Sequence, residues 1–133
     1  MSTTIHAASV TIDDIRAAAR GLSGLGVRTP VIDVPGLAAR AGVPVALKCE
    51  HLQITGAFKV RGAYTAVSRV AREGGGRGVV TQSSGNHGQA LAWAAREFGL
   101  RAVVVMPAST PRVKVEGVER HQEIGRASCR ERV

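Results

Sequence analysis

The sequence predicts an α/β fold with a parallel sheet flanked by helices. Four short apolar runs, at residues 31–34, 45–49, 78–81 and 102–106, alternate with segments whose apolar residues recur at helical spacing. This alternation is typical of βαβ units, whose strands pair in parallel. The 133 residues, 44% of them hydrophobic, are enough for one domain with a core of Ala, Val, Leu and Ile.

The first helix is predicted to begin near Thr11. The stretch from Thr11 to Asp14 has a capping-box pattern, in which side chains at both ends bond the free backbone N–H groups. Ile12, Ile15 and Ala19 then share one helix face, and Gly21 ends the helix.

A strand, a short helix and a second strand are expected next. Residues 31–34 predict the first strand, and residues 45–49 predict the second. The helix between them is expected from Pro35 to Ala41 and closes at Gly42, because proline suits the first helical turn and glycine suits the position after the last.

After Gly56 the apolar period changes from two residues to about 3.6, which predicts an amphipathic helix. Its apolar face comprises Val60, Ala63, Tyr64, Val67, Val70 and Ala71. Lys59 therefore lies in the first turn of this helix, where free N–H groups and the helix dipole favour a nearby anion.

The rest of the chain alternates strands and helices. Residues 78–81 predict a buried strand, and residues 83–88 turn into a helix that Gly99 ends. The buried stripe of that helix comprises Leu91, Ala94, Ala95 and Phe98. Residues 102–106 predict another strand, after which a last helix begins near Pro111.

The formal net charge of +8 raises the question of a nucleic-acid partner, but the charge pattern argues against one. The arginines are scattered without a basic block, and aromatic residues that could stack on bases make up 3% of the chain. We therefore expect no nucleic-acid binding.

No apolar run is long enough to span a bilayer, and the N-terminus lacks a secretory pattern. We therefore expect a cytoplasmic protein with no membrane partner. The cysteines, Cys49 and Cys129, and the four histidines are too dispersed to predict a disulfide framework or a metal site.

The end of the chain does not resemble a folded segment. Residues 123–133 carry no apolar period and no strand pattern, and they resemble the translation of a sequencing adapter. An ordinary charged C-terminal helix is the alternative. We expect residues 1–122 to be native and residues 123–133 to be a non-native tail.

Two segments carry side chains suited to catalysis. In the first, residues 56–63, Lys59 follows Phe58, opens a helix and has Arg61 two positions on. A lysine forms imines near neutral pH when it is partly desolvated and close to cations or dipoles. A lysine at a helix start is more often simply solvated, so the local pattern leaves both interpretations open.

The second segment is residues 81–89, where a strand gives way to a small polar turn and a helix N-terminus. Its hydroxyls, amide and free N–H groups are suited to bind a carboxylate or a phosphate. The alternative is that Ser84 or Asn86 merely caps the helix.

Together, these segments resemble the threonine dehydratase and serine racemase group of fold-type-II pyridoxal phosphate enzymes, whose architecture is tryptophan synthase β-like. Residues 58–63 match the group's lysine motif, and residues 83–89 match its asparagine loop. The likeness extends over about residues 10–120. The related cysteine synthases differ in both motifs.

The resemblance implies pyridoxal 5′-phosphate as cofactor and Lys59 as its Schiff-base lysine, which also takes the proton from the substrate's Cα. Asn86 would bind the cofactor's 3-hydroxyl. The substrate carboxylate would be bound by Ser83, Ser84, Gly85 and His87. The implied reaction is that of an ammonia-lyase (dehydratase), which converts L-threonine or L-serine to a 2-oxo acid and ammonia.

Ser84 adds serine racemisation to the activities that the resemblance allows. In serine racemases, a serine at this loop position acts as acid and base on the face opposite the lysine. A racemase needs a proton carrier on each face of the substrate, and a hydroxyl at Ser84 meets that need.

The chain also departs from the group. Ala57 replaces the usual serine before Phe58. The group's glycine-rich phosphate loop lies downstream of both motifs, whereas Gly74-Gly75-Gly76 lies between them. We therefore expect residues 1–122 to be a truncated, inactive N-terminal portion of a catalytic domain whose full-length form is a homo-oligomer acting on small amino acids. The alternative is a non-catalytic cofactor-binding or interaction module derived from the same fold.

Overall fold

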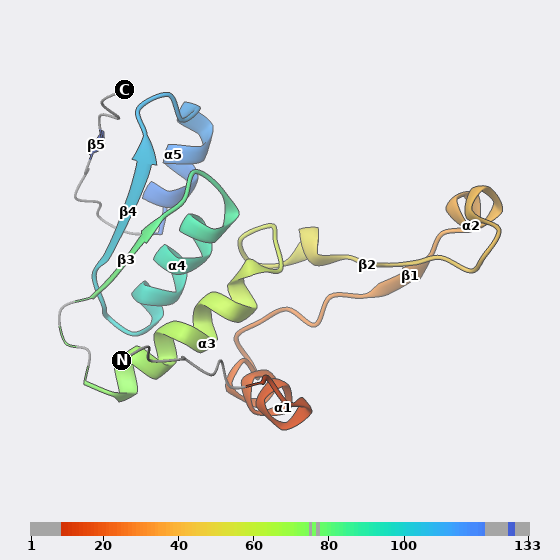
Figure 1. Cartoon of the computed structure of the whole chain (residues 1–133), viewed down its shortest axis with the longest axis horizontal. Helices are drawn as coiled ribbons and strands as arrows, with labels where there is room; N and C mark the ends of the chain where they lie inside the picture. The colour runs from red at the N-terminus through yellow and green to blue at the C-terminus, as the bar shows by residue number, and fades with distance from the viewer. Residues whose placement is uncertain (1–8, 75, 77, 122–127, 130–133) are drawn as a thin grey trace, which may run out of the picture.

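The computed structural model describes residues 9–74, 76, 78–121 and 128–129. The elements follow in the order α1 (Ile12–Gly21), β1 (Val31–Asp33), α2 (Pro35–Ala41), β2 (Ala46–Lys48), the 3-10 helix η1 (Glu50–Leu52), α3 (Lys59–Arg72), β3 (Val79–Gln82), α4 (Asn86–Glu97), β4 (Ala102–Pro107), α5 (Arg112–Glu119) and β5 (Ser128–Cys129). Figure 1 shows a sheet with its helices on one side of the molecule and an arm of β1, α2 and β2 on the other.

The larger sheet has the parallel pairing that the sequence predicts. Strand β3 pairs with β4 from Val79 opposite Ala102 to Gln82 opposite Val105, and β4 pairs in parallel with β5. The short strand β5 was not predicted, since residues 123–133 carry no strand pattern. The predicted non-native tail otherwise lies outside the described residues.

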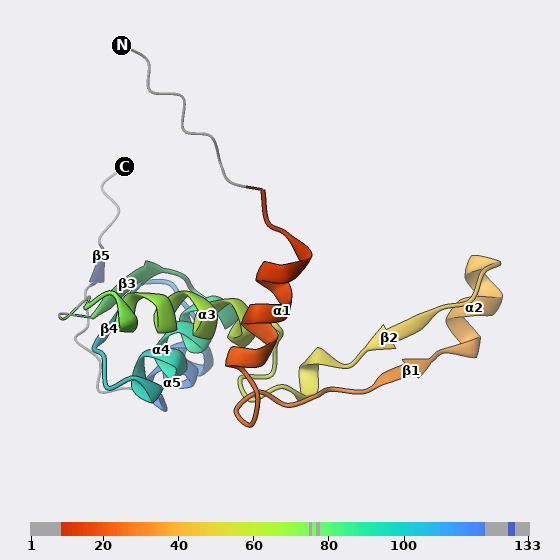
Figure 2. The same ribbon diagram turned by 90° about the horizontal axis from the view of Figure 1, so that it is seen from below.

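The pairing of β1 with β2 differs from the prediction, because these strands are antiparallel and form a separate two-stranded sheet. A parallel pair needs a crossover that returns the chain to the end where the first strand began. The seven-residue α2 instead reverses the chain at the tip of the arm, with Gly42 in a left-handed conformation after its last turn. Figure 2 shows the arm extending away from the helices and the larger sheet.

Helices α3 and α4 pack side by side and form the core with the larger sheet. On α3, Val60 and Val67 are fully buried, as the predicted apolar face requires. They belong to one cluster with Leu91 and Trp93 of α4. The ring of Tyr64 lies 5.8 Å from that of Trp93, a spacing that adds aromatic attraction to the burial of apolar area.

The strand at Val79–Gln82 is less buried than predicted. Its side chains alternate between partly buried and exposed, and Val80 is 72% exposed. Successive side chains on a strand point to opposite faces, so a sheet covered on one face buries only every second residue. Within the described residues, the face that carries Val80 is left uncovered.

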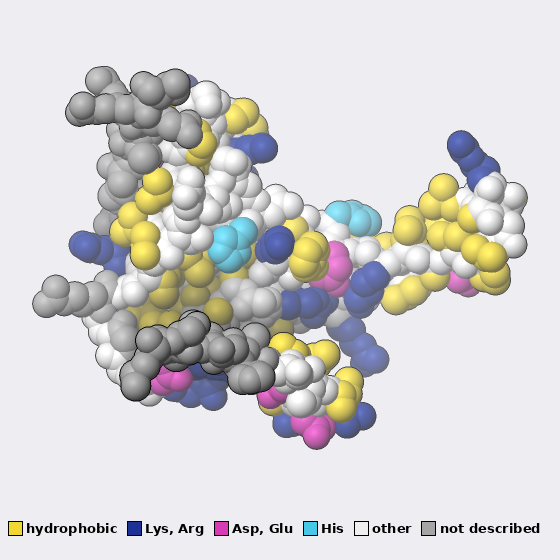
Figure 3. Space-filling model, viewed as in Figure 1, with side chains coloured by type: hydrophobic (Ala, Val, Ile, Leu, Met, Phe, Trp, Pro, Cys, Tyr) yellow, Lys and Arg dark blue, Asp and Glu magenta, His cyan; other side chains and the backbone are white. Residues whose placement is uncertain are grey.

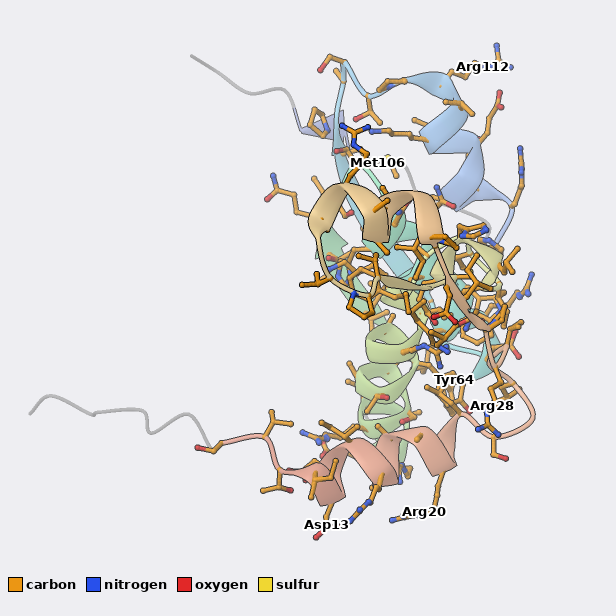
Figure 4. The ribbon with its side chains drawn as sticks, turned by 90° about the vertical axis from the view of Figure 1, so that its right-hand side faces the viewer. Asp13, Arg20, Arg28, Tyr64, Met106 and Arg112 are labelled. Carbon is orange, nitrogen blue, oxygen red and sulfur yellow. The ribbon has the colours of Figure 1, made fainter. Side chains whose placement is uncertain are left out.

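Helix α1 begins as predicted but does not bury its apolar side chains. Thr11 is the N-cap, and its side chain and that of Asp14 form both bonds of a capping box. Ile12 is nevertheless 58% exposed, and α1 has no buried residue. Asp13 and Arg20 point outward from the same helix (Figure 4).

Among residues 9–74, 76, 78–121 and 128–129, no helix is both long and apolar enough to cross a bilayer.

Candidate active site

Lys59 is the first residue of α3, and its side chain is exposed. Its neighbours Ala57 and Val60 are buried, so the backbone on each side of Lys59 is anchored. The amine Nζ lies 4.9 Å from the centre of the Phe58 ring, close enough for a cation–π interaction. The amine is thus accessible while its backbone is fixed, which is what covalent attachment of a ligand requires.

The polar loop at residues 83–88 is organised by Ser83. Its hydroxyl oxygen accepts hydrogen bonds from the N–H groups of Gly85 and Gly88, at 3.3 and 3.1 Å. The cap residue of α4 is Gly85, with no side-chain capping bond, so neither Ser84 nor Asn86 has the capping role that the sequence left open. Because a serine hydroxyl also carries one donor, Ser83 can still bond an anion.

The remaining polar side chains of the loop, Ser84, Asn86 and His87, are exposed. They lie at the first turn of the twelve-residue α4, where the free N–H groups and the helix dipole favour negative charge. A hydroxyl, an amide and an imidazole can together orient a small anion with several hydrogen bonds.

Gly88 allows the loop to lie directly against the sheet. A Cβ at this position would come within 2.9 Å of Val104 Cγ1 and 3.3 Å of the Ser83 carbonyl oxygen. Any larger residue would push α4 away from β4. The position of the loop is therefore set by the packing of α4 on the sheet.

The two predicted segments lie at the same end of the helix pair. Helices α3 and α4 run side by side, and Figure 1 shows both of them beginning on the side that faces the arm. Lys59 opens the first helix, and Asn86 opens the second. The structure thus places the lysine and the polar loop at the same end of the core.

A partly buried polar cluster lies at the start of α3, and the sequence did not predict it. Arg61 donates two hydrogen bonds to Glu50, from Nε to Oε2 at 2.9 Å and from Nη2 to Oε1 at 2.8 Å. The Thr29 hydroxyl donates to the same carboxylate, and Lys48 Nζ donates to the Thr29 carbonyl oxygen. Arg61 is therefore paired with Glu50 and is not the free cation beside Lys59 that its position in the motif suggested.

Gln53 extends this cluster to the segment that leaves α1. Its side chain is almost fully buried, and it accepts a hydrogen bond from the Val27 N–H at 2.9 Å and donates one to the Val27 carbonyl oxygen at 2.8 Å. Arg61 also donates to that carbonyl oxygen, at 3.2 Å. The chain around Val27, the segment at residues 50–53 and the first turn of α3 are thereby joined.

The electrostatics of the cluster favour a charged carboxylate. The hydrogen bonds from Arg61 lower the pKa of Glu50 from its ordinary 4.5 to about 2, with help from Thr29 and Lys48 and against the effect of burial. Bidentate bonds between arginine and a carboxylate fix the mutual orientation of the two groups as well as adding energy. In the sequence, the sign of this cluster was Glu50, the charged residue that directly follows the predicted strand at residues 45–49.

Within residues 9–74, 76, 78–121 and 128–129, no group of three side chains could together hold a metal ion. The polar side chains of Lys59 and of the loop at residues 83–88 are an amine, hydroxyls, an amide and an imidazole.

Comparisons with known proteins point to one family. A family model for pyridoxal-phosphate dependent enzymes matches residues 22–123. The chain is 47% identical over 102 residues to an L-threo-3-hydroxyaspartate ammonia-lyase from a Pseudomonas species, covering 77% of this chain and 32% of the relative. It is 40% identical over 111 residues to a serine racemase from Dictyostelium discoideum, covering 84% of this chain and 34% of the relative.

Solved structures agree with these matches. An aspartate racemase dependent on pyridoxal 5′-phosphate superimposes with a TM-score of 0.81 at 39% identity, over 90% of this chain and 38% of that structure. Maize serine racemase gives a TM-score of 0.81 at 38% identity, over 90% of this chain and 37% of that structure. The chain spans about a third of the length of the curated relatives it matches.

The Glu50 cluster predicts a specific loss of stability in acid. A carboxyl whose pKa is lower in the folded chain stabilises that chain above its unfolded pKa and loses this effect as the pH falls through its folded pKa. We expect the free energy of unfolding to fall by about 1–3 kcal/mol between pH 4.5 and pH 2 through this group. Urea unfolding of the native chain and of Glu50→Gln across this range measures the effect.

Glu50→Gln should be less stable than the native chain at neutral pH and should lack this part of the acid dependence. Glu97→Gln is the matched control, because Glu97 pairs with Arg96 at 3.4 Å near the end of α4 and away from the cluster. Equal acid dependence in the native chain and in Glu50→Gln would contradict the assignment.

Proposed function

The chain belongs to the family of pyridoxal-phosphate dependent enzymes, and on this premise we propose that it carries the lysine and the substrate loop of an ammonia-lyase (dehydratase). The substrates proposed are L-threonine and L-serine, and the products are a 2-oxo acid and ammonia. The observation that supports this most directly is the location of Lys59 and the loop at residues 83–88 at one end of α3 and α4.

The donor set at this end suits pyridoxal 5′-phosphate. An exposed primary amine with an anchored backbone can attach to an aldehyde, and the amide of Asn86 can bond the cofactor's 3-hydroxyl. The cofactor supplies, when bound, a ring that accepts electrons from the substrate's Cα. The chain's own residues must then bind the substrate, orient it and move its protons.

The loop is proposed to hold the substrate carboxylate. Ser83 keeps one donor free, Ser84 and His87 are exposed donors, and the backbone N–H groups after Gly85 point the positive end of the α4 dipole toward an anion. A carboxylate held there would present its Cα to Lys59, which is proposed to take the proton as general base.

Ser84 supports a further, racemase activity. Its hydroxyl is exposed at the start of α4, whereas Lys59 comes from the neighbouring helix α3. Proton carriers on two different elements can reach opposite faces of one Cα, which racemisation requires. Serine racemisation is therefore proposed as a side activity of the same site.

One relative extends the substrates to be tested. The Pseudomonas protein at 47% identity is named for its action on L-threo-3-hydroxyaspartate, which, like serine and threonine, carries a β-hydroxyl. In all three amino acids, removal of the Cα proton could be followed by loss of the β-hydroxyl as water, and hydrolysis of the resulting enamine would release ammonia and leave the 2-oxo acid. The assays below therefore include all three.

The activity is proposed for a whole protein of the relatives' length, acting in the cytoplasm as a homo-oligomer on small amino acids. The second candidate function is a non-catalytic cofactor-binding or interaction module derived from the same fold.

The first prediction from this proposal concerns the three lysines, Lys48, Lys59 and Lys114. Incubation with pyridoxal 5′-phosphate and reduction with borohydride should label Lys59 about tenfold more than Lys114, since an oriented amine reacts faster than a free one. Peptide mass spectrometry reads out the sites. Lys59→Arg should remove the main label, and Lys114→Arg should leave it; equal labelling of all three lysines would contradict the proposal.

The second prediction concerns turnover. The 133-residue chain should release ammonia from L-serine, L-threonine or L-threo-3-hydroxyaspartate only at the background rate, because it covers about a third of its relatives. Formation of a 2-oxo acid that disappears in Lys59→Ala would overturn this expectation. A protein of the relatives' length that traps the cofactor on Lys59 but forms neither 2-oxo acid nor D-serine would favour the non-catalytic module.

A further inference from the structure

We propose that Glu50 is a positioning residue for Lys59, acting through Arg61 to fix the first turn of α3. The inference rests on the proposed function, in which the Lys59 amine must face the loop at residues 83–88. What it adds is a role for the polar cluster of Glu50, Arg61, Thr29 and Gln53, whose side chains bond one another and the backbone of Val27.

The helix geometry separates Arg61 from Lys59. Two residues along an α-helix correspond to about 200° of rotation, so the two side chains leave α3 on different sides. Arg61 reaches back to Glu50 and to the Val27 carbonyl oxygen, while Lys59 lies beside Phe58. A bond on the far side of the turn can brace the helix without blocking the amine.

The bonds of Arg61 add to the anchoring of the α3 start. Its cap residue, Phe58, makes no side-chain capping bond, and both Phe58 and Lys59 are exposed. Uncapped first turns leave backbone N–H groups unpaired and are weakly held. Besides the buried Ala57 and Val60, the paired Arg61 is what ties this turn to the rest of the molecule.

The paired hydrogen bonds between Arg61 and Glu50 orient the two side chains as well as attracting their charges. The Glu50 side chain is 16% exposed and that of Arg61 is 37% exposed, so the pair is partly shielded from solvent. Both carboxylate oxygens take a bond from the same guanidinium, which fixes the plane and direction of both groups. Lysine in place of arginine would keep the charge and lose this fork.

Thr29 and Gln53 hold the other side of the brace. Thr29 is buried and donates to Glu50, and Gln53 is buried and bonds both backbone groups of Val27. The Glu50 carboxylate is thus held by Thr29 as well as by Arg61. The direction of the α3 first turn, and with it that of the Lys59 side chain, follows from this fixed acceptor.

The test compares two aldehydes on the same three lysines of the 133-residue chain. Pyridoxal 5′-phosphate needs an amine oriented toward its site, whereas formaldehyde with borohydride methylates any exposed amine. Glu50→Gln and Arg61→Lys should each lower the labelling of Lys59 relative to Lys114 by pyridoxal 5′-phosphate about tenfold. Neither change should alter the methylation ratio, and Glu97→Gln should alter neither ratio.

The outcomes are distinct. If the two substitutions leave the pyridoxal 5′-phosphate ratio unchanged, or lower both ratios together, Glu50 has only a structural role and the inference fails. If the native chain itself shows no preference for Lys59, the proposed function fails and the inference with it. Trp93 fluorescence in each variant identifies conditions in which the chain remains folded.

Discussion

The packing of α3 against α4 is the constraint on which the rest of the molecule depends. Val60 and Val67 of α3 meet Leu91 and Trp93 of α4, and Gly88 allows α4 to lie directly on β4. Because both helices begin at the same end of this core, Lys59 and the polar loop lie at that end. The chemistry of the site therefore follows from how two helices share one apolar interface.

The second organising feature is the polar cluster at Glu50. It joins the segment after α1, the end of the arm and the start of α3 through hydrogen bonds that span up to 34 positions in sequence. Figure 3 shows that apolar side chains lie along the arm itself. The strands and helix of the arm contain no buried residue, so the arm has no core of its own.

The sequence was informative wherever a local pattern determines the structure. The capping box at Thr11 and the apolar face of α3 predicted those helices, and two motifs placed Lys59 and Asn86 at helix starts. The antiparallel arm and the Glu50 cluster were missed, because pairing direction and long-range bonds leave no periodic signal. The exposure of Val80 was also missed, since an apolar pattern marks a face without showing what covers it.

The central claim is that the first turns of α3 and α4 form part of one cofactor site. The most direct measurement is a titration of the isotope-labelled chain with pyridoxal 5′-phosphate, followed by the backbone amide signals in nuclear magnetic resonance spectra. The account predicts that the largest shifts fall on Lys59, Asn86 and His87, with small shifts around Lys114. Shifts centred on Lys114, or spread over the scattered arginines with none at the two helix starts, would contradict it.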